Sequence, residues 1–281
     1  MPDRRAAGRM PALALTLTAL VMPLGCGDDD EGGEAAEPRT VAIELTGSNK
    51  NLRFTVPDSV PAGLSRVQFR NSAKGDHGAQ LAYVDEGYTV EAGLRAAQAW
   101  GERGRPLPRW VHLAGGVGTV KSGETGTATQ RLPAGSYVVV DIDSNTSAEF
   151  RVTGDGAEGE PPSTSATIEA TEYKFDARGL TAGRNEVRYD NAGSEPHFVE
   201  GLRIKSGKTI ADVRKFIRDE KGEPPFTESG LFVSAVTDGG VSQTLELDLR
   251  AGKYALLCFV PDRKGGPPHA VKGMVSEATV R

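Results

Sequence analysis

Residues Cys258 to Met274 read CFVPDRKGGPPHAVKGM and place a thiol, an imidazole and a thioether in that order. Ten residues separate Cys258 from His269, and four separate His269 from Met274. A second imidazole, His197, lies upstream in the segment NAGSEPHFVE. Downstream, the segment VSEATVR alternates apolar and polar residues, as a closing β-strand does. The stretch therefore predicts a β-fold whose last two strands flank a loop with sulfur and nitrogen donors.

Two histidines, one cysteine and one methionine are the ligand set of a blue-copper centre. After the first 26 residues, Cys258 is the only cysteine and Met274 the only methionine. This arrangement resembles the cupredoxin family, in particular rusticyanin-like and copper nitrite reductase-like proteins, in which a late strand ends in Cys and a loop leads to His and then Met. The resemblance implies one type 1 copper ion bound by His197, Cys258, His269 and Met274. The ten-residue loop is longer than the loop of the small cupredoxins.

In such a site the thiolate supplies the short, strong bond, the imidazoles complete a trigonal plane, and the thioether is the weak axial ligand. Pro196 and Pro268 precede the two histidines and stiffen their turns, because proline fixes its own φ. Asn191 is a candidate for orienting the turn that carries His197. In the alternative interpretation, Cys258 and Met274 are buried core residues and His269 is a surface loop residue.

The N-terminus predicts export. Arg4, Arg5 and Arg9 precede an apolar run, residues 10–24, that is too short to span a bilayer. Gly25-Cys26 resembles a bacterial lipobox, with Pro23 where the usual leucine stands. We expect a signal peptide over residues 1–26, lipidation of Cys26, and an acidic flexible tether over residues 27–39. The protein would then be an extracytoplasmic lipoprotein, in the periplasm or on the cell surface. Plain secretion with a disulfide-capable Cys26 is the alternative.

The rest of the chain contains an internal repeat. A shift of 120 residues superposes Val67 on Val187, Phe69 on Tyr189, Asn71 on Asn191 and His77 on His197, and a shift of 117 superposes Tyr137 on Tyr254. The segment 154–164, GDGAEGEPPST, is rich in Gly, Pro and acidic residues, as linkers are. We predict two cupredoxin-like domains, residues 40–153 and 165–281.

Each predicted domain has short runs of period-2 alternation separated by Gly, Pro and Asn, which indicates a β-sandwich. Thr89 and Thr209 are candidate N-caps of one inserted helix per domain, and the second helix carries an apolar stripe that begins at Ile210. The predicted fold class is all-β, with two tandem Greek-key sandwiches.

The two repeats differ at the candidate ligands. The shift of 117 places Asp141 opposite Cys258, and no His or Met follows Asp141 in the segment DSNTSAEFRVTG. We therefore expect copper only in the second domain. His77 is either a remnant held by local hydrogen bonds or a ligand to a group bound between the domains.

The net charge of −5 argues against nucleic acid as a partner. The sequence lacks the His-x-His pairs of copper oxidases, and we see no hydrolase or phosphate-binding motif. The prediction is a membrane-anchored one-electron carrier, not an enzyme, with a redox protein as its partner. A metal-free binding module and a copper storage or delivery protein are the alternatives.

Overall fold

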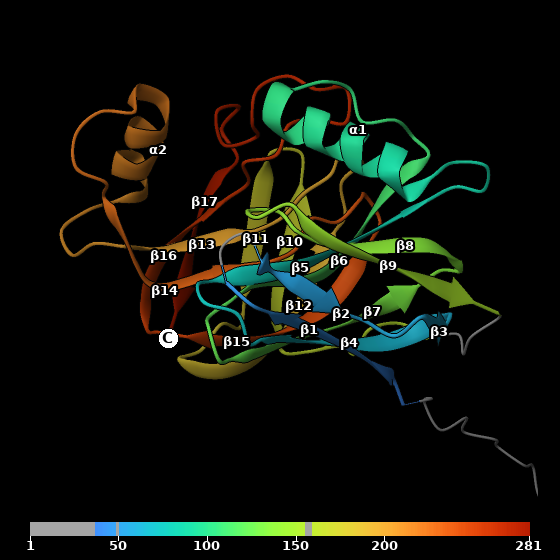
Figure 1. Ribbon diagram of the computed structural model, residues 1–281. Coiled ribbons are helices and arrows are strands. Elements are labelled where there is room, and N and C mark those ends of the chain that lie inside the picture. Colours follow the sequence, from blue (N-terminus) through green and yellow to red (C-terminus); the bar gives the residue numbers. More distant parts are fainter. Residues whose placement is uncertain (1–36, 49–50, 155–158) are drawn as a thin grey trace, which may run out of the picture. The chain divides into compact units, whose positions relative to one another are not determined.

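Strands make up most of the regular structure in the computed structural model, which describes residues 37–48, 51–154 and 159–281. They form three sheets of eight, five and four strands, and two helices complete the described fold (Figure 1). The predicted all-β fold class, with β-sandwiches and two inserted helices, is confirmed.

The strands of the first half are β1 Arg39–Thr46, β2 Arg53–Thr55, β3 Ser59–Pro61, β4 Gly63–Asn71, β5 His77–Val84, β6 Val111–Val120, β7 Thr125–Leu132, β8 Gly135–Asp141 and β9 Thr146–Thr153. Those of the second half are β10 Ala166–Thr171, β11 Lys174–Arg178, β12 Gly183–Asn191, β13 Glu200–Ile204, β14 Phe226–Val233, β15 Ser242–Leu249, β16 Gly252–Leu257 and β17 Val275–Val280. The helices are α1 Val90–Arg103 and α2 Ile210–Asp219.

In several strands, buried and less buried side chains alternate along the sequence, as in a sheet with one face against the core. In β12, Val187, Tyr189 and Asn191 are buried and the residues between them are not. One face of this strand is therefore held against the core, because side chains two residues apart share a face. Strand β4 has the same alternation 120 residues earlier.

The eight-stranded sheet has the order β11-β10-β12-β15-β7-β4-β1-β2 and takes strands from both halves of the chain. The halves meet where β15 pairs antiparallel with β7, with Leu245 opposite Ala128. Gln80 strengthens this junction, because its side chain accepts from the Val236 N–H at 2.7 Å and donates to the Val236 carbonyl at 2.9 Å. The five-stranded sheet, β3-β9-β8-β5-β6, comes from the first half, and the four-stranded sheet, β14-β13-β16-β17, comes from the second.

Both helices begin at the predicted caps. The Thr89 side chain accepts from the Ala92 N–H, and Thr209 forms a reciprocal capping box with Asp212. Helix α2 buries Val213, and its apolar stripe packs on a cluster that includes Leu202 and Val275. Helix α1 buries Trp100 in a separate cluster over the five-stranded sheet.

The predicted signal peptide, the Cys26 lipidation site and most of the acidic tether lie outside the described residues. The predicted linker is described only in part, and the two-domain boundaries stay a prediction. Neither helix of the described chain has the length and apolarity needed to cross a membrane.

Candidate metal centre

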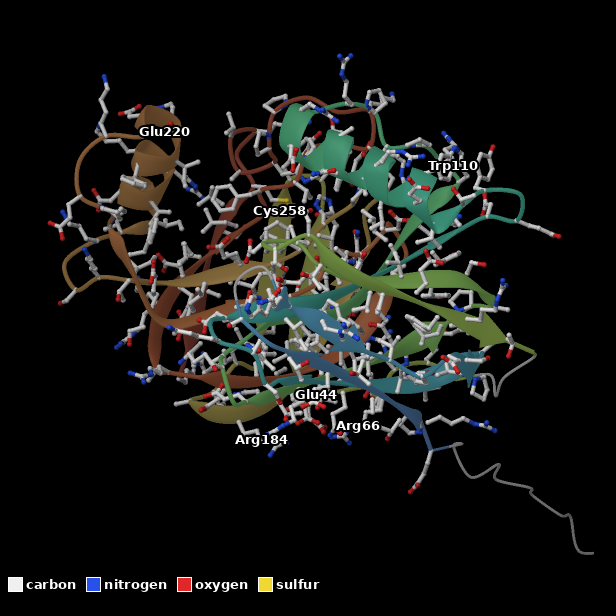
Figure 2. The ribbon with its side chains drawn as sticks, viewed as in Figure 1. Glu44, Arg66, Trp110, Arg184, Glu220 and Cys258 are labelled. Carbon is white, nitrogen blue, oxygen red and sulfur yellow. The ribbon has the colours of Figure 1, made fainter. Side chains whose placement is uncertain are left out.

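Three of the predicted donors converge in the second half of the chain. The Cys258 Sγ atom lies 3.5 Å from His269 Nδ1 and 3.8 Å from His197 Nδ1, and the two Nδ1 atoms are 3.0 Å apart. All three side chains are fully buried, and Figure 2 shows Cys258 inside the protein, beside the red loop that follows β16. Met274 is also fully buried and shares the apolar core cluster of Cys258. The structure thus brings together residues that are up to 77 positions apart in the sequence.

His197 lies in the turn that follows β12, and backbone hydrogen bonds to Thr237 hold it in place. Its backbone N–H donates to the Thr237 carbonyl at 3.0 Å, and the Thr237 N–H donates back at 2.8 Å. The Asn191 side chain donates to the carbonyls of Thr237 and Glu195, each at 2.9 Å. Asn191 therefore fixes both sides of the turn that carries the imidazole, which is the role for which the sequence made it a candidate.

Cys258 directly follows β16, and the loop after it is closed by main-chain hydrogen bonds. The Ala270 N–H donates to the Cys258 carbonyl at 2.7 Å, and the His269 N–H donates to the Val260 carbonyl at 3.0 Å. The Met274 N–H then donates to the His269 carbonyl at 2.9 Å. These bonds hold the backbone of Cys258, His269 and Met274 together although the loop is long.

The separations of the donors fit a single metal ion. With bonds of about 2.0 Å to imidazole nitrogen and about 2.3 Å to thiolate sulfur, a trigonal plane puts sulfur and nitrogen about 3.7 Å apart and the two nitrogens about 3.5 Å apart. The observed sulfur-to-nitrogen distances, 3.5 and 3.8 Å, match this plane, and the observed nitrogen-to-nitrogen distance of 3.0 Å is shorter than in the ideal plane. Within the described residues, this is the one group of three or more His, Cys, Asp and Glu donors placed to hold an ion. Two imidazoles, a thiol and a nearby thioether fit a type 1 copper site.

This donor set and the β-sandwich that holds it resemble those of the cupredoxins. Auracyanin from Roseiflexus castenholzii is similar at 20% identity over 41% of this chain and 94% of its own, with a TM-score of 0.27. Auracyanin A from Chloroflexus aurantiacus, described as a blue copper protein, is similar at 21% identity over 42% of this chain and 100% of its own, with a TM-score of 0.30.

A copper-containing nitrite reductase from Thermus scotoductus is similar at 12% identity over 86% of this chain and 61% of its own, with a TM-score of 0.22. No protein-family model matches the chain, and no curated protein matches it in sequence.

The prediction that the chain is not an enzyme is corrected by these likenesses. The similar structures include the nitrite reductase and a multicopper oxidase, and both are enzymes by name. The prediction rests on the lack of His-x-His pairs, the small number of histidines, and the lack of hydrolase and phosphate-binding motifs in the sequence. A fold of this kind serves carriers and enzymes alike, so the architecture does not separate the two.

Burial governs the protonation of the donors in this cupredoxin-like site. It lowers the pKa of His197 to about 4, with a contribution from neighbouring His269, and it also lowers the pKa of His269. Burial raises the pKa of the Cys258 thiol to about 12, although the N–H groups of Phe198 and Val260 act in the opposite direction. At neutral pH the metal-free site therefore holds two neutral imidazoles and one thiol, and ion binding must displace the thiol proton.

A polar cap that sequence reasoning missed covers His269. The His269 Nε2–H donates to Asp262 Oδ1 at 3.0 Å, and the Tyr173 hydroxyl donates to the same oxygen at 3.0 Å. Lys272 forms an ion pair with the other carboxylate oxygen and donates to the Tyr173 hydroxyl at 3.2 Å. Although burial alone would raise it, these bonds hold the pKa of Asp262 below its usual value. Because an ionised carboxylate only accepts, it leaves the His269 Nδ1 lone pair free to face Cys258.

The long loop also rests on the first half of the chain. The Trp100 Nε1–H of α1 donates to the Asp262 carbonyl at 2.8 Å, and the Leu107 N–H donates to the Arg263 carbonyl at 2.7 Å. The Arg263 guanidinium donates in turn to the carbonyls of Pro108, at 2.9 Å, and Val111, at 3.1 Å. The metal loop is thus supported from outside its own half.

The matching place in the first half holds a hydrogen-bonded pair of side chains. His77 Nδ1 lies 2.9 Å from Asp141 Oδ2, and Asp141 also accepts from the N–H groups of Gly78 and Ser144. The sequence comparison had set Asp141 opposite Cys258, and the structure puts it against the histidine that matches His197. The hydrogen bonds agree with the interpretation of His77 as a locally satisfied remnant.

Proposed function

We propose that this protein binds one copper ion at His197, Cys258, His269 and Met274 and uses it to carry single electrons. The observation that supports the proposal most is the convergence of the two Nδ1 atoms and the Cys258 Sγ within 3.8 Å, fully buried. Bound copper would supply the one-electron couple Cu(II)/Cu(I). The chain supplies the donors and excludes water from them.

The rigidity of the site supports electron transfer. His197 is fixed by Thr237 and Asn191, and His269 is fixed by Val260 and by the Asp262 carboxylate. Cu(I) and Cu(II) prefer different geometries, so donors that cannot relax between them keep the reorganisation free energy of each transfer small. The Asp262 cap would hold the imidazole plane in both oxidation states.

We further propose that the chain is an extracytoplasmic lipoprotein with two cupredoxin-like domains, residues 40–153 and 165–281, and copper only in the second. The basic and apolar leader and the Gly25-Cys26 pair support export and lipidation. The His77–Asp141 pair supports the absence of type 1 copper from the first domain. Mass spectrometry of the protein from its own membranes tests the anchor, since a mature chain that begins with diacylated Cys26 is expected. An unmodified Cys26 would refute lipidation.

Copper reconstitution tests the central assignment. The mature chain with Cys26→Ser, titrated with Cu(II), should bind one equivalent, develop the intense colour of thiolate-to-copper charge transfer and show one reversible one-electron wave in voltammetry. Cys258→Ser should abolish the colour at unchanged fold. Tight Cu(I) binding without colour would favour storage or delivery, and no copper binding at all would leave a metal-free module.

A further inference from the structure

A cavity of about 500 Å³ is lined by α1, by strands of the five-stranded sheet and by residues next to the metal donors. Figure 1 shows α1 above these strands. One wall consists of Val90, Leu94, Ala97 and Trp100 of α1, and strands β5, β6 and β8 supply the floor. The third wall comes from the second half of the chain and includes Phe198 and Phe259, which follow His197 and Cys258 in sequence. Its volume falls in the range of about 300 to 1,000 Å³ that is typical of small-molecule sites.

Most of the residues that line the cavity are apolar. Gly101, an exposed lining residue of α1, has open space around its Cβ position. Two of the four exposed large apolar side chains of the described chain line this cavity, Ile142 at 60% and Phe259 at 37% exposed. An apolar molecule in the cavity would cover side chains that are otherwise in contact with water, and this burial favours binding.

Charge selects among apolar ligands. Among the described residues that line the cavity there is no Lys, Arg or His, and its charged residues are Glu102, Asp141 and Asp143. Asp141 already accepts from His77, Gly78 and Ser144, while Glu102 and Asp143 are exposed. A carboxylate or phosphate on the ligand would find no cation to pair with among these residues and would lose its hydration without compensation.

We propose that this cavity binds a mainly apolar small molecule without negative charge, whose hydroxyl or amide end lies near Glu102 and Asp143. Most of the lining comes from the first half of the chain, so ligand binding would give that half a function of its own, in addition to the metal site of the second half. Its occupant would contact Phe198, Phe259 and Trp100, and Trp100 donates to the loop that carries His269. The proposal is independent of the copper assignment, because metal-free protein is sufficient to test it.

The test is calorimetric titration of metal-free mature chain, with Cys26→Ser and under reducing conditions, with 1-octanol and with octanoate at pH 7. We expect saturable binding of octanol at one site and binding of octanoate at least about ten-fold weaker, because the carboxylate has no partner in the cavity. Fluorescence of the Trp110→Phe variant, in which Trp100 is the one remaining tryptophan, should change with the same saturation.

Ala97→Phe fills the cavity and should weaken octanol binding at least ten-fold. Ala99→Phe, on the same helix but outside the lining, is the matched control and should bind as the parent does. Gly101→Leu serves as a second filling variant, since open space at its Cβ avoids overpacking. Absence of saturable octanol binding, equal affinity for octanoate, or unchanged affinity in the folded filling variants would overturn the proposal.

Discussion

Replacing Asp262 by Asn should raise the reduction potential of the copper-loaded protein. The side chain keeps its shape, but the negative charge that faces His269 Nε2 at 3.0 Å is lost. A carboxylate stabilises Cu(II) more than Cu(I), because the oxidised ion has one more positive charge. Its removal therefore favours the reduced state.

The size of the effect follows from distance. The 3.0 Å hydrogen bond, the imidazole ring and a metal–nitrogen bond of about 2 Å place the carboxylate about 7 Å from the ion. At an effective dielectric constant of about 20 this corresponds to about 2.4 kcal/mol for one unit of charge, or about 100 mV for a one-electron couple. The Asp262 side chain is 22% exposed, so solvent reduces the expected rise to about 50 to 100 mV.

Lys272 allows a second test with the opposite sign, because it is the ion-pair partner of the Asp262 carboxylate. Lys272→Met removes a positive charge near the ion and should lower the potential by about 40 to 80 mV, by the same Coulomb estimate at a slightly longer distance. Protein-film voltammetry measures both variants and the double variant, which should return close to the parent. A fall in potential for Asp262→Asn, or shifts of the same sign in both variants, would contradict an electrostatic effect of Asp262 on the copper ion.

Three further results are expected. Copper(II) binding at pH 7 should release about one proton per ion. Burial raises the pKa of Cys258 to about 12, so the thiol is protonated before binding, and burial lowers the pKa of His197 to about 4 and also that of His269, so both imidazoles are already neutral. Titration with an indicator dye measures the released protons, and a value of zero or two would contradict the prediction. Gln80→Leu should lower the free energy of unfolding in urea by about 1 to 3 kcal/mol, because the Val236 N–H loses its acceptor, and a change under about 0.5 kcal/mol would speak against the junction described above. His77→Ala should leave copper binding at one ion per chain, whereas loss of copper would assign His77 a ligand role.

Much of the fold was predictable because it depends on local pattern. Burial of every second residue in β12 and capping by Thr89 and Thr209 follow from the geometry of strands and helices. The candidate site was predictable for a different reason. Cysteine and methionine are so rare in this chain that Cys258 and Met274, so close to His269, had few competing explanations.

What the sequence did not predict depends on contacts between distant, irregular segments. The pairing of β15 with β7 joins residues more than 100 positions apart and depends on which sheet edges are free, which no periodicity records. Asp262 lies in PDRKGG, a segment with the composition of a turn, so its bond to His269 appears only once the loop is folded. The hydrogen bond from Trp100 to the metal loop could not be predicted either, because no sequence pattern tells which carbonyl accepts from the N–H of a buried tryptophan.

X-ray absorption at the copper K edge, recorded on the loaded mature chain and on Cys258→Ser, tests the metal centre most directly. We expect one short copper–sulfur bond with two imidazole nitrogens in the parent, and loss of that sulfur scatterer in the variant. A parent spectrum with only nitrogen and oxygen around copper, or one unchanged by Cys258→Ser, would contradict it.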